Sequence, residues 1–285
     1  ATAQCGEDGY IGWVMANPGK KVTVWGDTNC DGTADGYLTV DTSKEGWAMY
    51  DAQGNYLGQR GWVKPKRTYA ALELQLNRAW DEKWSMNASY TMSWNRGNAE
   101  GPVNSDTNFD DTGRTENFDD PWVNLGGNGY LPNDRRHQFK LRGTYALTPH
   151  WQLGADMSAA SGGPITGFGV GNPYDATNYH SYFVCVQNCD SPVSEDRVYA
   201  RSPRGKYGRL PWTFTLNTGI SYIQPFDGGE FRIKLAVYNL LNQKRTTAVD
   251  QDLQTSISNS TSETFRQPLG FQSPRFTQLT MSVNF

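Results

Sequence analysis

Alternation of apolar and polar residues is the strongest pattern in the sequence, and it predicts β-strands. In 84–94, for example, Trp84, Met86 and Ala88 share one face of an extended chain, whereas Ser85 and Asn87 share the other. Six further segments alternate in the same way, and helical periodicity is scarce. The seven predicted strands span residues 68–80, 84–94, 137–147, 151–159, 212–223, 231–241 and 276–285.

The connections between these strands fall into two classes. Short turns are predicted near 81–83, 148–150 and 227–229, whereas long polar segments occupy roughly 96–134, 161–210 and 243–273. Strands of about ten residues with one apolar face, short turns at one end and long loops at the other are typical of a transmembrane β-barrel. Aromatic residues beside the short turns fit the girdle expected at the periplasmic membrane interface: Trp80, Trp84, Tyr145 and Trp151.

A water-soluble β-sandwich is the alternative, because its strands alternate as well. Two features favour the barrel. Loops of roughly 30–50 residues are long for a compact sandwich, and the polar faces carry charges that a hydrated lumen accommodates, namely Lys140, Arg142, Asp156, Arg232 and Lys234. We therefore predict an all-β, antiparallel transmembrane barrel with its long loops outside the cell.

Composition excludes two other classes of protein. The 285 residues are 37% hydrophobic, and no apolar run reaches about 18 residues, so a transmembrane helix is excluded. The formal net charge is -3, and lysine and arginine do not cluster in the sequence. Nucleic acid is therefore not an expected partner, because binding to its phosphates requires concentrated positive charge.

Four cysteines form a separated pair, Cys5 and Cys30, and a close pair, Cys185 and Cys189. Three connectivities are possible, and the sequence alone does not choose among them. Proximity favours a disulfide within each pair, and zinc is disfavoured because no histidine lies near either pair. Disulfides imply an exported protein. No signal peptide opens the chain, so its first residue is interpreted as a mature or internal end.

Motifs of a known family lie on the predicted strands. The chain ends on "QLTMSVNF", with Phe285 last, which is similar to the terminal signal by which bacterial outer-membrane proteins are recognised for assembly. The segment "AVYNLLNQK" resembles the penultimate strand of TonB-dependent receptors. Together with "KRTYAALELQLNRAW", "ASYTMSWNRGNAEG", "GYLPNDRRHQFKLRGTY" and "SAASGGPI", these segments resemble the last third of an Oar-like TonB-dependent receptor, from about Lys66 to Phe285.

The resemblance implies a 22-stranded barrel that encloses an N-terminal plug and carries a TonB box, neither of which is in this chain. Counting back from Phe285 assigns residues 1–67 to an extracellular loop region and 68–285 to the C-terminal barrel strands. Seven strands cannot close a barrel, and open edges in lipid are costly. The expected partners are therefore the rest of the barrel and the plug, from the same gene product or a separate chain, the TonB complex, and outer-membrane lipid.

An acidic loop in the first region resembles a calcium-binding loop. Asp27, Asn29 and Asp31 occupy the first, third and fifth positions, Thr33 offers a carbonyl at the seventh and Asp35 a carboxylate at the ninth. Position 12, where the pattern requires glutamate, is a leucine. Asp41, Glu7 or Asp8 would have to complete the shell, and the alternative is a polar hairpin with Asx turns. The flanking segments are expected to be short strands.

Other polar and aromatic residues allow two interpretations each. The acidic stretch 106–120 has no glycine at the turn position and is interpreted as a solvated loop. Loop aromatics either stack on a ligand or pack on one another: Trp122, Tyr130, Tyr174, Tyr179, Tyr182 and Phe183. The lumenal cations either guide an anionic substrate or, as we favour, pair with plug carboxylates: Lys140, Arg142, Arg232 and Lys234.

No enzyme activity is expected, because His137, His150 and His180 adjoin no nucleophile motif. The first hypothesis is energy-coupled import of a ligand across the bacterial outer membrane, which the resemblance implies. The second is a surface protein for adhesion or binding, in which the barrel displays calcium-stiffened loops. A passive porin is the third. Nothing in the loops identifies a substrate.

Overall fold

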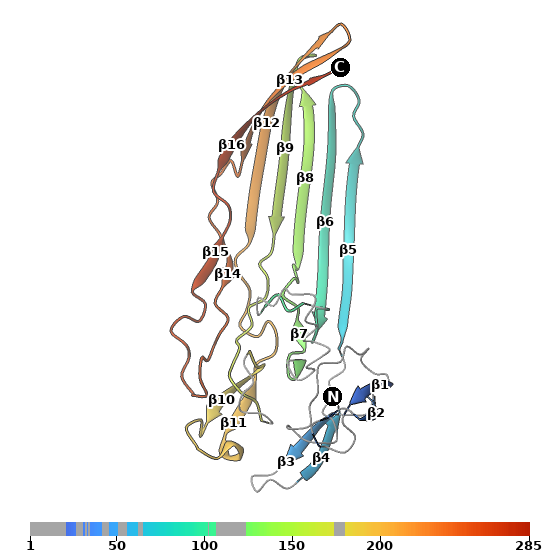
Figure 1. The fold of residues 1–285 in the computed structure, drawn as a ribbon. Helices are drawn as coiled ribbons and strands as arrows, with labels where there is room; N and C mark the ends of the chain where they lie inside the picture. Colours follow the sequence, from blue (N-terminus) through green and yellow to red (C-terminus); the bar gives the residue numbers. More distant parts are fainter. Residues whose placement is uncertain are drawn as a thin grey trace.

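The computed structural model describes residues 21–26, 31, 33, 35–41, 46–50, 56–61, 65–101, 103–106, 124–173 and 180–285. Among them, no helix is long and apolar enough to cross a membrane. The main element is one antiparallel sheet, drawn as the long arrows of Figure 1. Its long strands are β5 (Arg67–Arg78), β6 (Trp84–Gly97), β8 (His137–Ala146), β9 (Trp151–Ala160), β12 (Thr213–Phe226), β13 (Gly229–Tyr238) and β16 (Phe276–Asn284).

Each long strand pairs with its neighbour in the chain, in the order β16-β13-β12-β9-β8-β6-β5. This up-and-down order is what short turns between alternating strands produce. The seven strands coincide with the seven segments predicted from alternation, so the predicted all-β antiparallel class is confirmed. The sheet is open, with β5 and β16 at its edges, so in this chain the barrel is partial rather than closed.

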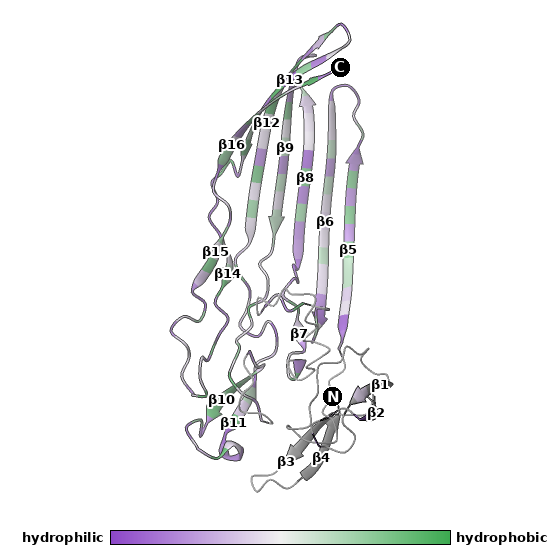
Figure 2. Ribbon diagram, in the orientation of Figure 1, coloured by the Kyte–Doolittle hydropathy of each residue, from purple (hydrophilic) through white to green (hydrophobic). Residues whose placement is uncertain are grey.

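The register gathers like residues into rows across the sheet. One row of the apolar face runs through Leu76, Ala88, Leu141, Met157 and Leu216. The adjacent row of the polar face runs through Asn77, Asn87, Arg142, Asp156 and Asn217. Figure 2 shows the same alternation as green and purple bands along the strands. Because the side-chain period of a strand is two, this register keeps the two faces separate.

The apolar face is uncovered in the described part of the chain. Leu74, Leu76 and Met281 are 57%, 61% and 62% exposed, although each lies on a strand of the main sheet. A β-sandwich would bury these side chains under a second sheet about 10 Å away. An exposed band of leucine, methionine and aromatic residues instead matches the lipid-facing surface of a membrane barrel.

Short turns join the strands at one end of the sheet (Figure 1). Asp81 Oδ1 accepts hydrogen bonds from the N–H groups of Trp84, at 2.9 Å, and Lys83, at 3.1 Å. The bond from Trp84, more than any other contact, lowers the pKa of the Asp81 carboxyl. At the third turn Phe226 pairs with Gly229 around Asp227 and Gly228, and Gly228 adopts a positive φ of 86°, as tight hairpins require.

The long connections at the other end contain short strands of their own. They are β7 (Gly129–Tyr130), which pairs with β6, the ribbon of β10 (Phe183–Gln187) and β11 (Val198–Arg201), and the ribbon of β14 (Thr246–Val249) and β15 (Pro268–Phe271). A 3-10 turn, η3 (Ser194–Asp196), lies between β10 and β11.

Two hairpins precede the main sheet, and Figure 1 places them at its loop end. They pair β1 (Lys21–Gly26) with β2 (Gly36–Asp41) and β3 (Gly46–Tyr50) with β4 (Tyr56–Gly61). The first hairpin confirms the short strands expected on either side of the acidic loop. The second was not predicted from the sequence.

Candidate functional site

The packed core lies in the long connections rather than against the main sheet. Leu131, Phe168 and Tyr182 are at most 2% exposed, and they come from the connections β6–β8 and β9–β12. Ile165 and Val184 are also buried in this loop cluster. Loops that bury apolar side chains against one another form a rigid cap instead of separate flexible arms. This loop cluster is the candidate functional site, because it combines the buried core of the described residues with a network of buried charges.

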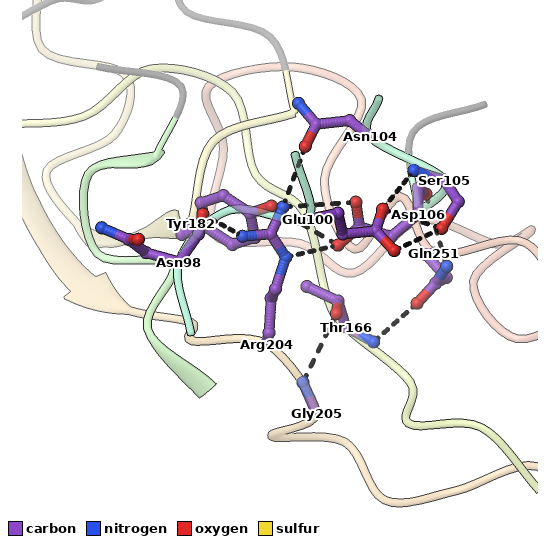
Figure 3. Close-up of polar contacts among 10 residues, drawn as sticks. All are labelled: Asn98, Glu100, Asn104, Ser105, Asp106, Thr166, Tyr182, Arg204, Gly205 and Gln251. Atoms are coloured by element: carbon purple, nitrogen blue, oxygen red, sulfur yellow. Dashed lines mark hydrogen bonds and ion pairs between the residues drawn. The ribbon is translucent and has the colours of Figure 1, made fainter. Parts of the chain in front are cut away.

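Arg204 is the polar centre of the loop cluster (Figure 3). Its side chain is fully buried and donates from Nε to Asp106 Oδ2 at 2.8 Å and from Nη2 to Asn104 Oδ1 at 3.2 Å. Nη1 donates to the carbonyl of Asn98. The guanidinium carbon lies 4.6 Å from the ring centroid of Tyr182, so a cation–π contact covers its flat face.

Burial and charge act in opposite directions on these groups. Burial disfavours the charge of Arg204, but attraction to the oxygens of Tyr182 and Asp106 outweighs it and raises the pKa of Arg204 above its ordinary value. Burial raises the pKa of the Tyr182 phenol well above its ordinary range, and the nearby guanidinium only partly offsets this. Arg204 and Asp106 therefore form an ion pair beside the neutral phenol of Tyr182.

Hydrogen bonds extend this network into all three long connections. Glu100 accepts two contacts from the Ser105 hydroxyl, both at 2.8 Å, which fixes the segment that contains Asp106. Gln251, between β14 and β15, accepts at 2.7 Å from the backbone of Thr166 and donates at 3.4 Å to the carbonyl of Asp106. Figure 3 shows these residues around Arg204. The network therefore ties the three connections into one unit.

Sequence reasoning did not find this network. The interpretation of 106–120 as a solvated loop is wrong for Asp106, because that residue is 8% exposed and paired with Arg204. The interpretation failed because an arginine nearly a hundred residues away neutralises the carboxylate, and no local pattern reveals such a partner. Residues 107–120 lie outside the described residues. Tyr182 and Phe183 pack inside the loop cluster rather than offering a surface to a ligand.

A second ionic cluster lies where the loop cluster meets the sheet. Asp134 is fully buried; its Oδ1 accepts from the backbone N–H of Asn95 and its other oxygen pairs with Arg209. Arg136 approaches the same carboxylate at 3.8 Å. Arg96, Arg136 and Arg209 surround the ring of Tyr130, and the hydrogen bond from Arg136, followed by the three positive charges, lowers the pKa of the Tyr130 phenol.

The polar face of the main sheet carries the cations predicted for a lumen. Arg142 Nε donates to Asp156 Oδ2 at 3.1 Å, and Asn217 contacts the other oxygen of Asp156 at 3.4 Å. Arg232 pairs with Glu230 at 3.1 Å. Part of this positive charge is thus balanced within the sheet itself. Of the four predicted lumenal cations, Lys140 and Lys234 have no ion pair with a described residue.

The predicted calcium loop is only partly described. Asp31, Thr33 and Asp35 lie between the paired strand ends Gly26 and Gly36, and the N–H of Thr33 donates to Asp31 Oδ1 at 2.8 Å, which forms an Asx turn. Asp27 and Asn29 lie outside the described residues. Within the described part of the chain, no group of three or more histidine, cysteine or acidic side chains is assembled for a metal.

A disulfide joins Cys185 to Cys189 at the end of β10, with their Cα atoms 5.8 Å apart. It closes the tip of the β10–β11 ribbon. Beside it lies an open polar pocket of about 390 Å³, lined by Asn188, Cys189, Asp190, Ser191, Asp196 and Asn259. Cys5 and Cys30 lie outside the described residues, so their pairing stays a prediction.

Comparisons with known proteins agree with the sequence motifs. No family model matches the chain. The chain is 29% identical over 189 residues to the TonB-dependent transporter Oar of Myxococcus xanthus. That match covers 66% of this chain and 16% of the transporter, so the chain spans about a sixth of the relative's length.

Among solved structures, the chain is similar to the closed form of the ferric-catecholate import receptor Fiu from E. coli K12. The TM-score is 0.39 with 13% sequence identity, over 83% of this chain and 23% of that receptor. A likeness at this level supports no argument of its own. Oar is a transporter, which is consistent with the expectation that the chain is not an enzyme. The sequence match to Oar confirms the resemblance of this chain to an Oar-like TonB-dependent receptor.

Proposed function

We propose that this chain is the C-terminal barrel portion of an outer-membrane TonB-dependent receptor that imports a ligand with energy from the inner membrane. The observation that supports this proposal most is the open sheet of long meandering strands with an exposed apolar face, in a chain similar to Oar. Such a face requires lipid, and a polar opposite face suits a hydrated lumen. In this proposal, residues 1–67 are an extracellular loop region and 68–285 form barrel strands.

The open edges of the sheet indicate which further parts the proposal requires. In the proposal, further barrel strands pair with β5 and β16, a plug fills the lumen, and TonB acts through a part of the receptor outside this chain. Lys140 and Lys234 on the polar face suit plug carboxylates as partners. In the proposal, the long connections, which lie at the end of the sheet opposite the short turns (Figure 1), face the outside of the cell, and the loop cluster around Arg204 contacts the ligand before it enters.

Orientation is tested by inserting one epitope tag after Ser256, in the β14–β15 connection, and another after Asp227, in a short turn. Both positions are exposed, so neither insertion disrupts packing. We expect antibody to label the first tag on intact cells and the second only after the outer membrane is opened. Labelling of the Asp227 tag on intact cells would reverse the proposed orientation.

Energy coupling is tested by measuring uptake of a panel of labelled siderophores, cobalamin, sugars and peptides in cells that carry the complete receptor. We expect one class to accumulate, and accumulation to stop when TonB is deleted or the proton gradient is collapsed. Uptake that persists in both conditions would contradict the proposal and favour a passive porin. Binding at the cell surface without any uptake would favour the adhesion hypothesis, to which the rigid loop cluster is also suited.

We propose further that Asp27, Asn29, Asp31, Thr33 and Asp35 hold a calcium ion that stiffens the β1–β2 hairpin. The pairing of Gly26 with Gly36 supports this, because it closes the connection that carries the five residues. Calorimetric titration of the complete receptor should show calcium binding that Asp31→Asn weakens. Asp227→Asn, in a short turn, is the control. If Asp31→Asn and the unaltered receptor bind calcium equally, the calcium proposal is wrong and the loop is a polar hairpin with an Asx turn.

A further inference from the structure

The apolar face of the sheet ends in a cluster of arginines at the loop end. On β6, Trp84, Met86, Ala88, Tyr90, Met92 and Trp94 alternate on the apolar face, and Arg96 follows in the same alternation. Trp84 to Arg96 covers about 40 Å of strand, or about 30 Å of membrane normal at a tilt of about 40°. The apolar band of such barrels is about 25 Å tall. Arg96 therefore lies at the level of the lipid headgroups.

Two other arginines reach the same place from different connections. Arg96 pairs in register with Tyr130, and its guanidinium carbon lies 4.5 Å from the centroid of the tyrosine ring. The corresponding distances for Arg136 and Arg209 are 5.1 and 5.2 Å. One aromatic ring thus gathers three cations, which would otherwise repel one another, at the loop end of the sheet.

The described residues neutralise only part of this charge. Asp134 is the one described carboxylate that pairs with the cluster; it contacts Arg209 and Arg136 and is fully buried. Arg96 is exposed and makes no ion pair with a described residue. The side chains of Arg136 and Arg209 remain 24% and 27% exposed. Among the described residues, three guanidinium groups therefore share this one carboxylate.

The contacts of each arginine show which donors remain. Arg209 uses Nη1 on the carbonyls of Asp134 and Gly162, at 3.0 and 3.2 Å, and Nη2 on the Asp134 carboxylate. Arg136 donates from Nε to the carbonyl of Ser93 at 3.1 Å. Arg96 has no side-chain hydrogen bond to a described residue. Arg136 also hydrogen-bonds the Tyr130 phenol, and its Nη2 lies 3.8 Å from the Asp134 carboxylate. Arg136 and Arg209 therefore anchor the cluster, whereas Arg96 presents its donors to an oxyanion.

Aromatic residues on the apolar face lie next to the cluster, on its membrane side. Tyr90 OH is 2.9 Å from His137 Nδ1, and the His137 ring stacks at 5.8 Å on Trp212. Such amphipathic rings concentrate at the boundary between hydrocarbon and water. The order of side chains towards the loops is leucine, then aromatic, then arginine, which matches the order of acyl chain, interface and phosphate in a lipid leaflet.

We propose that Arg96, Arg136 and Arg209 form a site for the phosphate of a phosphorylated glycolipid in the outer leaflet, with Tyr130 holding the three guanidinium groups in position. Guanidinium forks match phosphate oxygens in geometry and charge. The site would fix the receptor in its leaflet and hold the rim where β6, β7 and β8 meet the loop cluster. This inference rests on the proposed orientation, in which the long connections face outward.

The test measures lipid binding to the complete receptor in detergent by native mass spectrometry, with diphosphoryl lipid A as the probe. We expect Arg96→Gln to weaken binding at least threefold and Arg96→Gln with Arg136→Gln at least tenfold, and Arg96→Lys to restore part of the loss. Arg201→Gln, which removes an exposed arginine of β11, is the control and should bind as the unaltered receptor does.

Three results would overturn the proposal: equal binding of lipid A by the unaltered receptor and Arg96→Gln, equal binding of the same lipid after its phosphates are removed, or full competition by millimolar inorganic phosphate. The last result would indicate a site for free phosphate rather than lipid. Because Arg96 is exposed, its single variant tests the idea even where the double variant misfolds. Failure of the proposed function would appear separately, in the epitope and uptake measurements.

Discussion

At the scale of single residues, Arg204 shows what holds the loop cluster together. A buried ion pair gains little net stability over apolar residues of the same shape, but the loss of one partner leaves an uncompensated buried charge. Asp106 would be that charge, since its side chain is 1% exposed and Arg204 is its ion-pair partner. Removing either charge alone should therefore open the three connections, because the remaining charge would be buried without its partner.

We predict that Arg204→Met destabilises the loop cluster by about 3–5 kcal/mol, the usual cost of removing one partner of a buried pair. Limited proteolysis of the folded receptor should then cut within the long connections. Arg201→Met, at an exposed position three residues earlier, is the matched control. Adding Asp106→Leu to Arg204→Met should recover part of the protection. Unchanged proteolysis of Arg204→Met would show that the pair does not hold the loops.

Asp81 gives a pH-dependent prediction at the opposite end of the sheet. Its pKa is lowered in the folded state, chiefly by the N–H of Trp84, so its carboxylate stabilises the turn above its unfolded pKa and loses this effect as pH falls through the lower folded value. Asp81→Ala should therefore lower the urea midpoint of unfolding at pH 7, and this difference should shrink as the pH falls through the folded pKa of Asp81. Asp81→Asn keeps the acceptor oxygen and should show a weaker pH dependence. A difference that is as large in acid as at pH 7 would contradict the mechanism.

At the scale of elements, the long strands followed from the sequence and the short ones did not. In β5 and β6, alternation over many residues specifies both the strand and the face it presents. Gly129 and Tyr130 form β7 only because Arg96 and Gly97 pair with them, and β14 and β15 are equally dependent on a distant partner. A strand of two to five residues has too few alternations for its own sequence to predict it.

The two faces of β8 give a prediction of membrane insertion. Leu141 lies at the middle of the strand on the apolar face, so Leu141→Arg places a charge in the hydrocarbon and should cost about 2–4 kcal/mol. Thr91→Arg, on the polar face of β6 opposite Glu73 and Gln138, is the matched control and should be tolerated. Urea unfolding of the receptor in lipid vesicles measures both. A larger loss for Thr91→Arg would mean that the faces are assigned the wrong way round.

At the scale of the whole molecule, the sequence predicted the sheet but not the site. Every long strand and short turn has a local signal, such as the Asp-Gly pair before Gly229, whereas the loop cluster depends on contacts between Asp106, Arg204 and Gln251, which lie in three different connections. Their partners follow from how the loops fold over the sheet. The calcium loop is the opposite case: its sequence pattern is local, but the assembly of its ligands around an ion stays a prediction.

The open edges lead to the last prediction. Along β5 and β16 the outer backbone N–H and C=O groups face no described strand, and in lipid each unpaired group costs several kcal/mol. We predict that residues 65–285 alone do not form a stable membrane-inserted sheet, and that further strands must pair with both edges. Expressed alone and refolded into lipid vesicles, they should migrate identically with and without heating in detergent gels, whereas the complete receptor should migrate faster unheated.

Hydrogen exchange of the complete receptor tests whether further strands pair with the edges β5 and β16. Amides of β5 and β16 should be protected to the same degree as those of the central strand β9, because each edge then has a partner on both sides. Fast exchange confined to β5 or β16 would indicate that this edge remains open and that the barrel closes elsewhere. A heat-modifiable sheet formed by residues 65–285 alone would contradict the prediction outright, since it would show that seven strands satisfy their edges without further protein.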